Sequence, residues 1–173
     1  MALSLFSLSC AVFAFALFAQ AGVSKLREPG TYTEVVSRYL GRSVGQGFVF
    51  VIGAVEVLLS ILVLLPTTRE VAGLVAAALL LVYGGLMARQ VTRGGHAMRC
   101  GCGAAGSDTV ISPELIIRNV VIAIPVLMMG MGAREAITPQ IALVGVAAGT
   151  LLSILYVALD QLIANRQKLQ GWY

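Results

Sequence analysis

The stretch FVFVIGAVEVLLSILVLL, residues 48–65, contains a single ionisable side chain, Glu56. A run of this kind is close to the roughly 20 residues that an α-helix needs to cross the hydrocarbon core of a bilayer. The chain contains four further apolar runs of similar length, at residues 3–23, 71–88, 115–131 and 141–163. A soluble core can bury one such helix, but a single chain of this size cannot bury five. The pattern therefore predicts that the chain crosses a membrane several times.

The composition supports this interpretation. The chain has 173 residues, of which 58% are hydrophobic and 12% are charged, whereas soluble domains are about one quarter charged. The net charge of +4 comes from short connecting segments without interleaved aromatic residues, which suits lipid headgroups and argues against nucleic-acid binding. We therefore predict one all-α integral membrane domain over residues 1–173, a bundle of about five transmembrane helices with a four-helix core plus one.

The first run is expected to remain in the protein as a transmembrane helix. No basic residue stands between Met1 and the apolar run, and no convincing small-x-small cleavage site ends the run. The segment therefore resembles a secretory signal peptide only in being hydrophobic. The connection after it is long and includes residues 31–40. Apolar side chains occupy one helical face of this segment: Tyr32, Val35, Val36, Tyr39 and Leu40. This spacing predicts a short interfacial helix whose tyrosines lie at headgroup depth.

A cysteine pair, Cys100 and Cys102, lies in the connection at residues 89–113, with Gly101 between the two thiols. A disulfide between residues i and i+2 closes a tight ring, and unfavourable geometry makes a disulfide easier to reduce. A structural disulfide gains little stability from such a short loop, because the entropic gain grows with loop length. The spacing therefore favours thiol–disulfide exchange over a permanent crosslink.

The residues around the pair favour a reactive thiolate. Arg99 precedes Cys100 directly, and His96 lies four residues before it. The sequence SPEL, residues 112–115, predicts the start of a helix, with serine as the N-cap and proline at the first helical position. The positive end of that helix dipole would then point toward the cysteine segment. Positive potential of this kind stabilises a thiolate.

Two alternative interpretations of the pair stay open. A structural zinc site needs about four ligands, and Cys100, Cys102 and His96 supply three, so a metal would require a ligand from a partner. The cysteines could also be incidental loop residues. We favour redox exchange and predict no metal site. Cys10 lies within the first apolar run and is expected to be an inert packing residue.

Ionisable side chains at membrane depth are costly and usually pair or line a functional cavity. Glu56 lies about 12 Å down its helix from the cysteine side and Arg118 about 8 Å, at a rise of about 1.5 Å per residue. We therefore expect a Glu56–Arg118 ion pair, with Asn119 as an additional partner. Such a pair either holds two helices together or forms a polar floor that orients a quinone headgroup or moves protons. Asp160 is expected at the membrane interface.

The distribution of basic residues favours a cytoplasmic cysteine loop. Alternation of the predicted spans places most lysines and arginines on the cysteine side: Lys25, Arg27, Arg38, Arg42, Arg89, Arg93, Arg99, Arg166 and Lys168. The opposite side carries Arg69 and Arg134.

Four elements together resemble the methylamine utilisation protein MauE family, within the wider DoxX-like membrane proteins. They are AGVSKLREP at residues 21–29, GAVEVLLSILVLLP at 53–66, CGC at 100–102 and SPELIIRN at 112–119. The Cys-Gly-Cys and Arg-Asn combination is the more specific part, since DoxX relatives without cysteines share the Gly-x-x-Lys-Leu element. One departure is that Gly103 and Ala104 stand where the family often has an aromatic residue.

This resemblance implies a bacterial inner-membrane protein that matures the disulfide-rich small subunit of methylamine dehydrogenase together with a thioredoxin-like partner, MauD. It places the cysteine loop on the periplasmic side, against the distribution of basic residues. The layout is also similar to that of vitamin K epoxide reductase-type bundles, which carry an additional relay pair of cysteines. Residues 24–47 contain no cysteine, so the partner would supply the relay.

The function expected from these features is membrane thiol–disulfide exchange. Cys100 would face the partner, and Cys102 would resolve the mixed disulfide. As an enzyme the chain would be a thiol–disulfide oxidoreductase, with a quinone as candidate electron acceptor. The alternative is a non-catalytic membrane scaffold that anchors the partner and in which the cysteines are structural.

Overall fold

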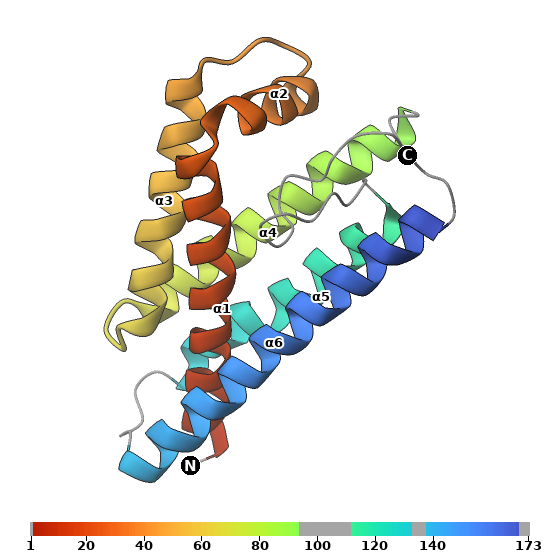
Figure 1. Ribbon diagram of the computed structural model, residues 1–173. Helices are drawn as coiled ribbons and strands as arrows, with labels where there is room; N and C mark the ends of the chain where they lie inside the picture. Colours follow the sequence, from red (N-terminus) through yellow and green to blue (C-terminus); the bar gives the residue numbers. More distant parts are fainter. Residues whose placement is uncertain (1, 94–111, 133–137, 170–173) are drawn as a thin grey trace.

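The computed structural model describes residues 2–93, 112–132 and 138–169, and every regular element in these ranges is helical (Figure 1). The elements are α1 (Ala2–Arg27), α2 (Pro29–Leu40), α3 (Gln46–Leu64), α4 (Arg69–Thr92), α5 (Pro113–Met128), the 3₁₀ helix η1 (Met129–Gly132) and α6 (Pro139–Leu169). Helices α1, α3, α4 and α6 are long and apolar enough to cross a membrane. The predicted all-α membrane fold is confirmed.

The five apolar runs of the sequence correspond to α1, α3, α4, α5 with η1, and α6, and only Leu65, which caps α3, lies outside these helices. Helix α5 has 16 residues and is shorter than α1, α3, α4 and α6, and η1 continues the chain after it to Gly132. Helix α6 continues beyond the expected end of its apolar run and includes Arg166 and Gln167. The segment expected as an interfacial helix corresponds to α2.

Helix α1 lies at the centre of the bundle. It packs along α3, crosses α6, and contacts η1 near its N-terminal end, whereas α5 packs mainly on α4 (Figure 1). The buried apolar cluster where these helices meet combines small and large side chains, among them Ala11, Ala14, Phe18, Ala76 and Val126. Small residues let transmembrane helices approach closely, which increases van der Waals contact.

The closest approach between α1 and α3 occurs at two glycines. A Cβ atom on Gly22 would lie 2.7 Å from the carbonyl oxygen of Gly53, and a Cβ on Gly53 would lie 3.0 Å from the carbonyl oxygen of Gly22. No real Cβ tolerates the shorter of these distances, so this crossing requires glycine on α1. Similar tight contacts join α6 to α1, where Gly149 faces Val12.

Arg69 closes the turn between α3 and α4. Its side chain is almost fully buried and donates hydrogen bonds from Nε to the carbonyl of Val63 at 3.0 Å and from Nη2 to the carbonyl of Leu64 at 2.8 Å. Its Nη1 contacts Ser7 Oγ at 3.4 Å, and that hydroxyl donates to the carbonyl of Met129. The last carbonyl groups of a helix have no hydrogen-bond donor within the helix. Arg69 supplies the missing donors for two of these carbonyls at the end of α3.

Helix α2 lies across the ends of α3 and α4 (Figure 1). Pro29 occupies its first turn, and Gly41 ends it in the left-handed region with φ 68°. The side chain of Gln90 on α4 donates to the carbonyl of Arg38 at 2.9 Å and contacts that of Tyr39 at 3.4 Å. This end of α2 is therefore tied to the last turn of α4.

Replacement of Gly22 by alanine should destabilise the bundle, because the added methyl group would meet the backbone of α3. Overpacking of this kind typically costs about 1–3 kcal/mol. Gly85 on α4 is the matched control, since a Cβ there meets nothing within 4 Å. We expect Gly85→Ala to be neutral or stabilising by up to about 1 kcal/mol, as helix propensity predicts. Thermal unfolding of both purified variants in detergent measures the difference, and equal stability would contradict the glycine crossing.

Candidate functional site

A buried ion pair joins α1 to α3. The Nζ atom of Lys25 lies 2.9 Å from Oε1 and 2.8 Å from Oε2 of Glu56, and the two side chains are 5% and 0% exposed. The same Nζ contacts the carbonyl oxygen of Ala21 at 3.4 Å. Charged groups at membrane depth are expensive unless they are paired and hydrogen-bonded. Here one ammonium satisfies both oxygens of one carboxylate.

The glycine crossing places these two charges together. Lys25 follows Gly22 by three residues, and Glu56 follows Gly53 by three residues. Helices α1 and α3 run in opposite directions (Figure 1). The backbone of Lys25 therefore lies on one side of the crossing point, and the backbone of Glu56 lies on the other. Helical side chains, however, lean toward the N-terminus of their own helix. The lysine and the glutamate therefore lean back toward the crossing from opposite ends and meet there.

Two tyrosines complete this cluster. The hydroxyl of Tyr83, on α4, donates a hydrogen bond to Oε1 of Glu56. The Nζ of Lys25 lies 5.5 Å from the ring centroids of both Tyr32, on α2, and Tyr83. These distances fall within the range of cation–π attraction. Four helices thus contribute one side chain each to a polar cluster whose formal charges cancel.

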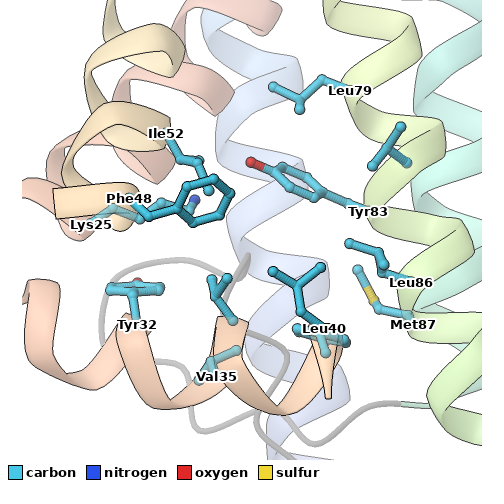
Figure 2. A pocket seen from close by; sticks show the side chains of 13 residues that line it. Lys25, Tyr32, Val35, Leu40, Phe48, Ile52, Leu79, Tyr83, Leu86 and Met87 are labelled. Atoms are coloured by element: carbon cyan, nitrogen blue, oxygen red, sulfur yellow. The ribbon is translucent and has the colours of Figure 1, made fainter. Parts of the chain in front are cut away.

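The cluster borders a cavity of about 270 Å³ between α2, α3 and α4 (Figure 2). Figure 2 shows Phe48 and Ile52 on one side, Leu79 and Tyr83 on the other, and α2 closing one end. The remaining lining residues are Lys25, Tyr32, Val35, Val36, Tyr39, Leu40, Val82, Leu86 and Met87. The apolar face predicted for residues 31–40 therefore lines this cavity. Of its two tyrosines, Tyr39 is buried and Tyr32 is partly buried.

A second polar cluster lies between α5 and α6. Arg118 Nη1 donates to Asp160 Oδ1, and the two side chains are 11% and 0% exposed. The guanidinium carbon of Arg118 lies 5.1 Å from the ring centroid of Tyr156. At the same end of these helices, Arg166 and Glu114 form an exposed ion pair at 3.0 Å. Side-chain interactions thus bridge α5 and α6.

The predicted Glu56–Arg118 ion pair is wrong. Glu56 binds Lys25 on α1, whereas α5 packs mainly on α4 and Arg118 binds Asp160 on α6. Asp160, expected at the membrane interface, has a fully buried side chain that pairs with Arg118. Glu56 and Arg118 lie at similar depths along their helices, but α3 packs on α1 and α5 packs on α4, so each charge has a different partner.

Asn119 was expected to accompany that pair and instead lies at the contact between α4 and α5. It is 4% exposed, and a Cβ on Gly84 would lie 3.7 Å from its own Cβ. The Nδ2 atom of Asn119 is buried and has no hydrogen-bond acceptor among the described residues. The same holds for the hydroxyl of Ser112, which is buried and has no hydrogen-bond partner among them. Ser112 has the extended backbone of an N-cap, and α5 begins at Pro113 as predicted, but the serine hydroxyl makes no capping hydrogen bond.

Cys100, Cys102, His96 and Arg99 lie outside the described residues. The described chain stops at Arg93 and resumes at Ser112, so these four residues connect the last turn of α4 to the first turn of α5. Cys10 is buried in the apolar cluster at 5% exposure. Among the described residues, no group of three histidine, cysteine, aspartate or glutamate side chains is arranged to hold a metal ion.

Sequence reasoning missed Lys25, Tyr83 and Asp160 as partners in the two clusters. Lys25 lies two residues after the first apolar run, in the segment expected to be a connection, although α1 continues to Arg27. A usable signal was present, because Gly22-x-x-Lys25 and Gly53-x-x-Glu56 both place a charge one turn after a small residue. Nothing in the sequence marked Tyr83 as different from other tyrosines.

Replacement of Lys25 by methionine should destabilise the protein strongly, because Glu56 would be left buried without its counter-charge. Removal of one member of a buried ion pair typically costs about 3–5 kcal/mol. The double variant Lys25→Met, Glu56→Gln removes both charges and should recover most of this loss. Thermal unfolding of the purified variants in detergent measures both effects.

The exposed pair Arg166–Glu114 provides the control for this experiment, because surface ion pairs contribute about 0–1 kcal/mol. Arg166→Met should therefore change the unfolding temperature little. If Lys25→Met behaved like Arg166→Met, the ion pair would not be the main link between α1 and α3.

Comparison with known proteins places the chain in one family. Residues 3–132 match the family described as Methylamine utilisation protein MauE. Two relatives carry that same description. The protein from Paracoccus denitrificans is 28% identical over 151 residues, which cover 85% of this chain and 81% of the relative. The protein from Methylophilus methylotrophus is 27% identical over 173 residues, which cover 92% and 88% respectively. No solved structure matches the chain.

Proposed function

Because the chain belongs to the family of Methylamine utilisation protein MauE, we propose that it serves methylamine utilisation as a membrane thiol–disulfide exchange protein. Its working sulfurs are those of Cys100 and Cys102. The single observation that carries this proposal is the Cys-Gly-Cys sequence in the segment between α4 and α5. Its i, i+2 spacing favours a reducible disulfide over a structural one.

The described ends of that segment support the proposal. Arg93 and Ser112 bound it, and α5 begins at Pro113, so the N-terminal end of α5 follows the segment directly. Unpaired backbone N–H groups and the dipole give a helix N-terminus positive potential. Arg99 and His96 add positive or ionisable side chains within four residues of Cys100. Such surroundings stabilise a thiolate, which is the nucleophile in exchange.

The exchange proceeds in two balanced steps. The Cys100 thiolate attacks a disulfide of the partner, forms a mixed disulfide and releases one partner thiolate. The Cys102 thiolate then attacks the Cys100 sulfur, closes the internal disulfide and releases the second partner thiolate. The partner is reduced by two electrons, and this chain is oxidised by two. In the opposite direction the same steps transfer a disulfide from this chain to a dithiol partner.

The partner proposed is a thioredoxin-like protein of the MauD type. The client is the small subunit of methylamine dehydrogenase, whose disulfides are formed during maturation. Residues 24–47 of this chain contain no cysteine that could relay electrons. In the proposed pathway the partner's own cysteine pair therefore provides the relay. Such a pathway requires the bacterial inner membrane, with the cysteine segment on the periplasmic side, where disulfides persist.

Replacement of Cys102 by serine should trap the mixed disulfide with the thioredoxin-like partner, because the resolving thiol is missing. We expect a covalent complex that a reductant releases, detected by nonreducing gel electrophoresis and mass spectrometry of full-length protein from membranes. Cys100→Ser should trap little complex, since the partner-facing sulfur is absent. Cys10→Ser is the matched control, because the Cys10 thiol is buried in the bundle core.

A membrane scaffold that anchors the partner without chemistry is the competing function. The double variant Cys100→Ser, Cys102→Ser distinguishes the two, because a scaffold would still support the formation of active methylamine dehydrogenase in cells. We expect loss of correctly oxidised small subunit. Maturation at the unaltered rate would reject the exchange function.

A further inference from the structure

Four exposed arginines gather where the end of α2 meets the end of α4, and we call them the arginine cluster. Arg38 lies in the last turn of α2, and Arg42 follows the C-cap of that helix. Arg89 lies in the last turn of α4, and Arg93 caps that helix. The side chain of Gln90 joins the two ends, because it donates to the carbonyl of Arg38 at 2.9 Å. All four arginines therefore lie within four residues of this hydrogen bond.

The chain that follows α2 is held in place by hydrogen bonds. The backbone N–H of Arg42 donates to the carbonyl of Ser37 at 3.2 Å, and the backbone N–H of Val44 donates to Ser37 Oγ at 3.1 Å. This segment thus folds back on the last turn of α2, which Gln90 ties to α4. The backbone positions of Arg38 and Arg42 are therefore fixed relative to α4.

The arginine cluster carries a net positive charge. Residues 35–55 and 71–107 contain no aspartate or glutamate. Glu34 lies one turn before Arg38 and is exposed, and in the part of the chain that the structure describes none of the four arginines belongs to an ion pair. Guanidinium groups bind phosphate oxygens through two parallel hydrogen bonds and stay charged at every physiological pH. The cluster therefore favours a ligand with a phosphate group.

The cluster lies at the depth of the lipid headgroups. Helix α4 has 24 residues, so it is about 36 Å long at about 1.5 Å per residue, which exceeds the roughly 30 Å of bilayer hydrocarbon. Its last turn therefore reaches the headgroup region, where α2 lies across the same end of the bundle (Figure 1). The phosphate groups concentrated at this depth are those of lipids.

The cavity of about 270 Å³ between α2, α3 and α4 adjoins the cluster (Figure 2). On α4, Val82 and Leu86 line the cavity, and the two arginines of α4 follow at spacings that keep all four residues on one face of the helix. On α2, the lining residue Leu40 stands between the two arginines of that end. The walls of the cavity therefore continue directly into the arginine cluster.

The cavity itself suits a hydrocarbon chain, because apolar side chains form most of its lining. The ammonium of Lys25 at its inner wall is turned to Glu56 and to the carbonyl of Ala21. Phe48 and Val82 are 48% and 55% exposed on membrane-spanning helices, so the cavity is open to the bilayer. Its volume is slightly below that of a typical small-molecule site, so it accommodates part of one acyl chain.

We propose that the arginine cluster and the cavity together bind one anionic phospholipid. Its phosphate lies on the guanidinium groups, one acyl chain enters the cavity between α3 and α4, and the other chain stays in the bilayer. The lipid thereby bridges α2 and α4. Binding does not depend on exchange at the cysteines, so failure of this proposal would leave the proposed function untouched.

The test is a lipid titration of the full-length protein in detergent, followed by native mass spectrometry. Phosphatidylglycerol and phosphatidylcholine with identical acyl chains are compared, because both carry a phosphate and only the first has a net negative charge. We expect the first phosphatidylglycerol to bind about tenfold or more tightly than phosphatidylcholine, since each arginine near a membrane surface adds about 1 kcal/mol of attraction to an anionic lipid. Glycerol 3-phosphate, which has no acyl chain, should not compete at equal concentration.

One variant removes an arginine from each helix of the cluster. Arg38→Gln with Arg89→Gln should abolish the preference for phosphatidylglycerol, and because both side chains are exposed the fold should be kept. Arg166→Gln is the matched control, since Arg166 is also exposed but pairs with Glu114 at the α5–α6 contact. This control should keep the preference of the unaltered protein.

A second variant fills the cavity. Leu79→Trp on α4 should weaken phosphatidylglycerol binding about tenfold, which corresponds to about 1.4 kcal/mol, because the acyl chain loses its place. Val71→Trp is its control, because Val71 is 67% exposed on α4 and does not line the cavity. Size-exclusion chromatography checks that both variants are folded.

Equal affinity for the two lipids, or an unchanged preference in the Arg38→Gln, Arg89→Gln variant, would overturn the proposal. Competition by glycerol 3-phosphate would also overturn it and would identify the cluster as a site for free phosphate compounds. A folded Leu79→Trp variant with unaltered affinity would show that no acyl chain enters the cavity. The lipid comparison and the arginine variant decide the question even if Leu79→Trp does not fold.

Discussion

The ion pair between Lys25 and Glu56 is the constraint on which the rest of the bundle depends. Neither charge can stay buried at membrane depth without the other, and the two meet because α1 and α3 cross at Gly22 and Gly53. Helix α1 also packs on α6 and η1, so fixing α3 to α1 positions α3 against the whole bundle. The same carboxylate accepts the hydroxyl of Tyr83, which adds α4 to this arrangement.

The bundle contains two buried polar clusters, which link different pairs of helices. The cluster around Glu56 borders the cavity under α2, and the cluster around Arg118 and Asp160 joins α5 to α6. The cysteine segment connects α4 to α5, and α4 contributes Tyr83 to the first cluster while α5 contributes Arg118 to the second. The two helices that flank the segment thus carry polar links, α4 to α3 and α5 to α6.

Much of the fold could be predicted from the sequence because hydropathy alone determines which segments form membrane helices. The run around Glu56 illustrates this, since it lies in α3, a helix long and apolar enough to cross a membrane. The run after Pro113 also forms a helix that starts where the local pattern predicts, although α5 has only 16 residues. The partners of the buried charges could not be predicted in the same way. A sequence position gives the depth of a side chain, but helix rotation depends on contacts such as Gly22 with Gly53, which involve distant residues. For this reason Glu56 was assigned to Arg118, and Lys25 was treated as a surface charge.

The central claim, that Cys100 and Cys102 form a disulfide that opens and closes during function, is tested most directly by their oxidation state in native membranes. Membranes that contain the full-length protein would be equilibrated with glutathione buffers of increasing oxidised fraction, alkylated and analysed by mass spectrometry. The account predicts that Cys100 and Cys102 pass together from alkylated thiols to a disulfide across this series, while Cys10 keeps one state throughout. Two sulfurs that stay bonded, or stay free, in every buffer would contradict it.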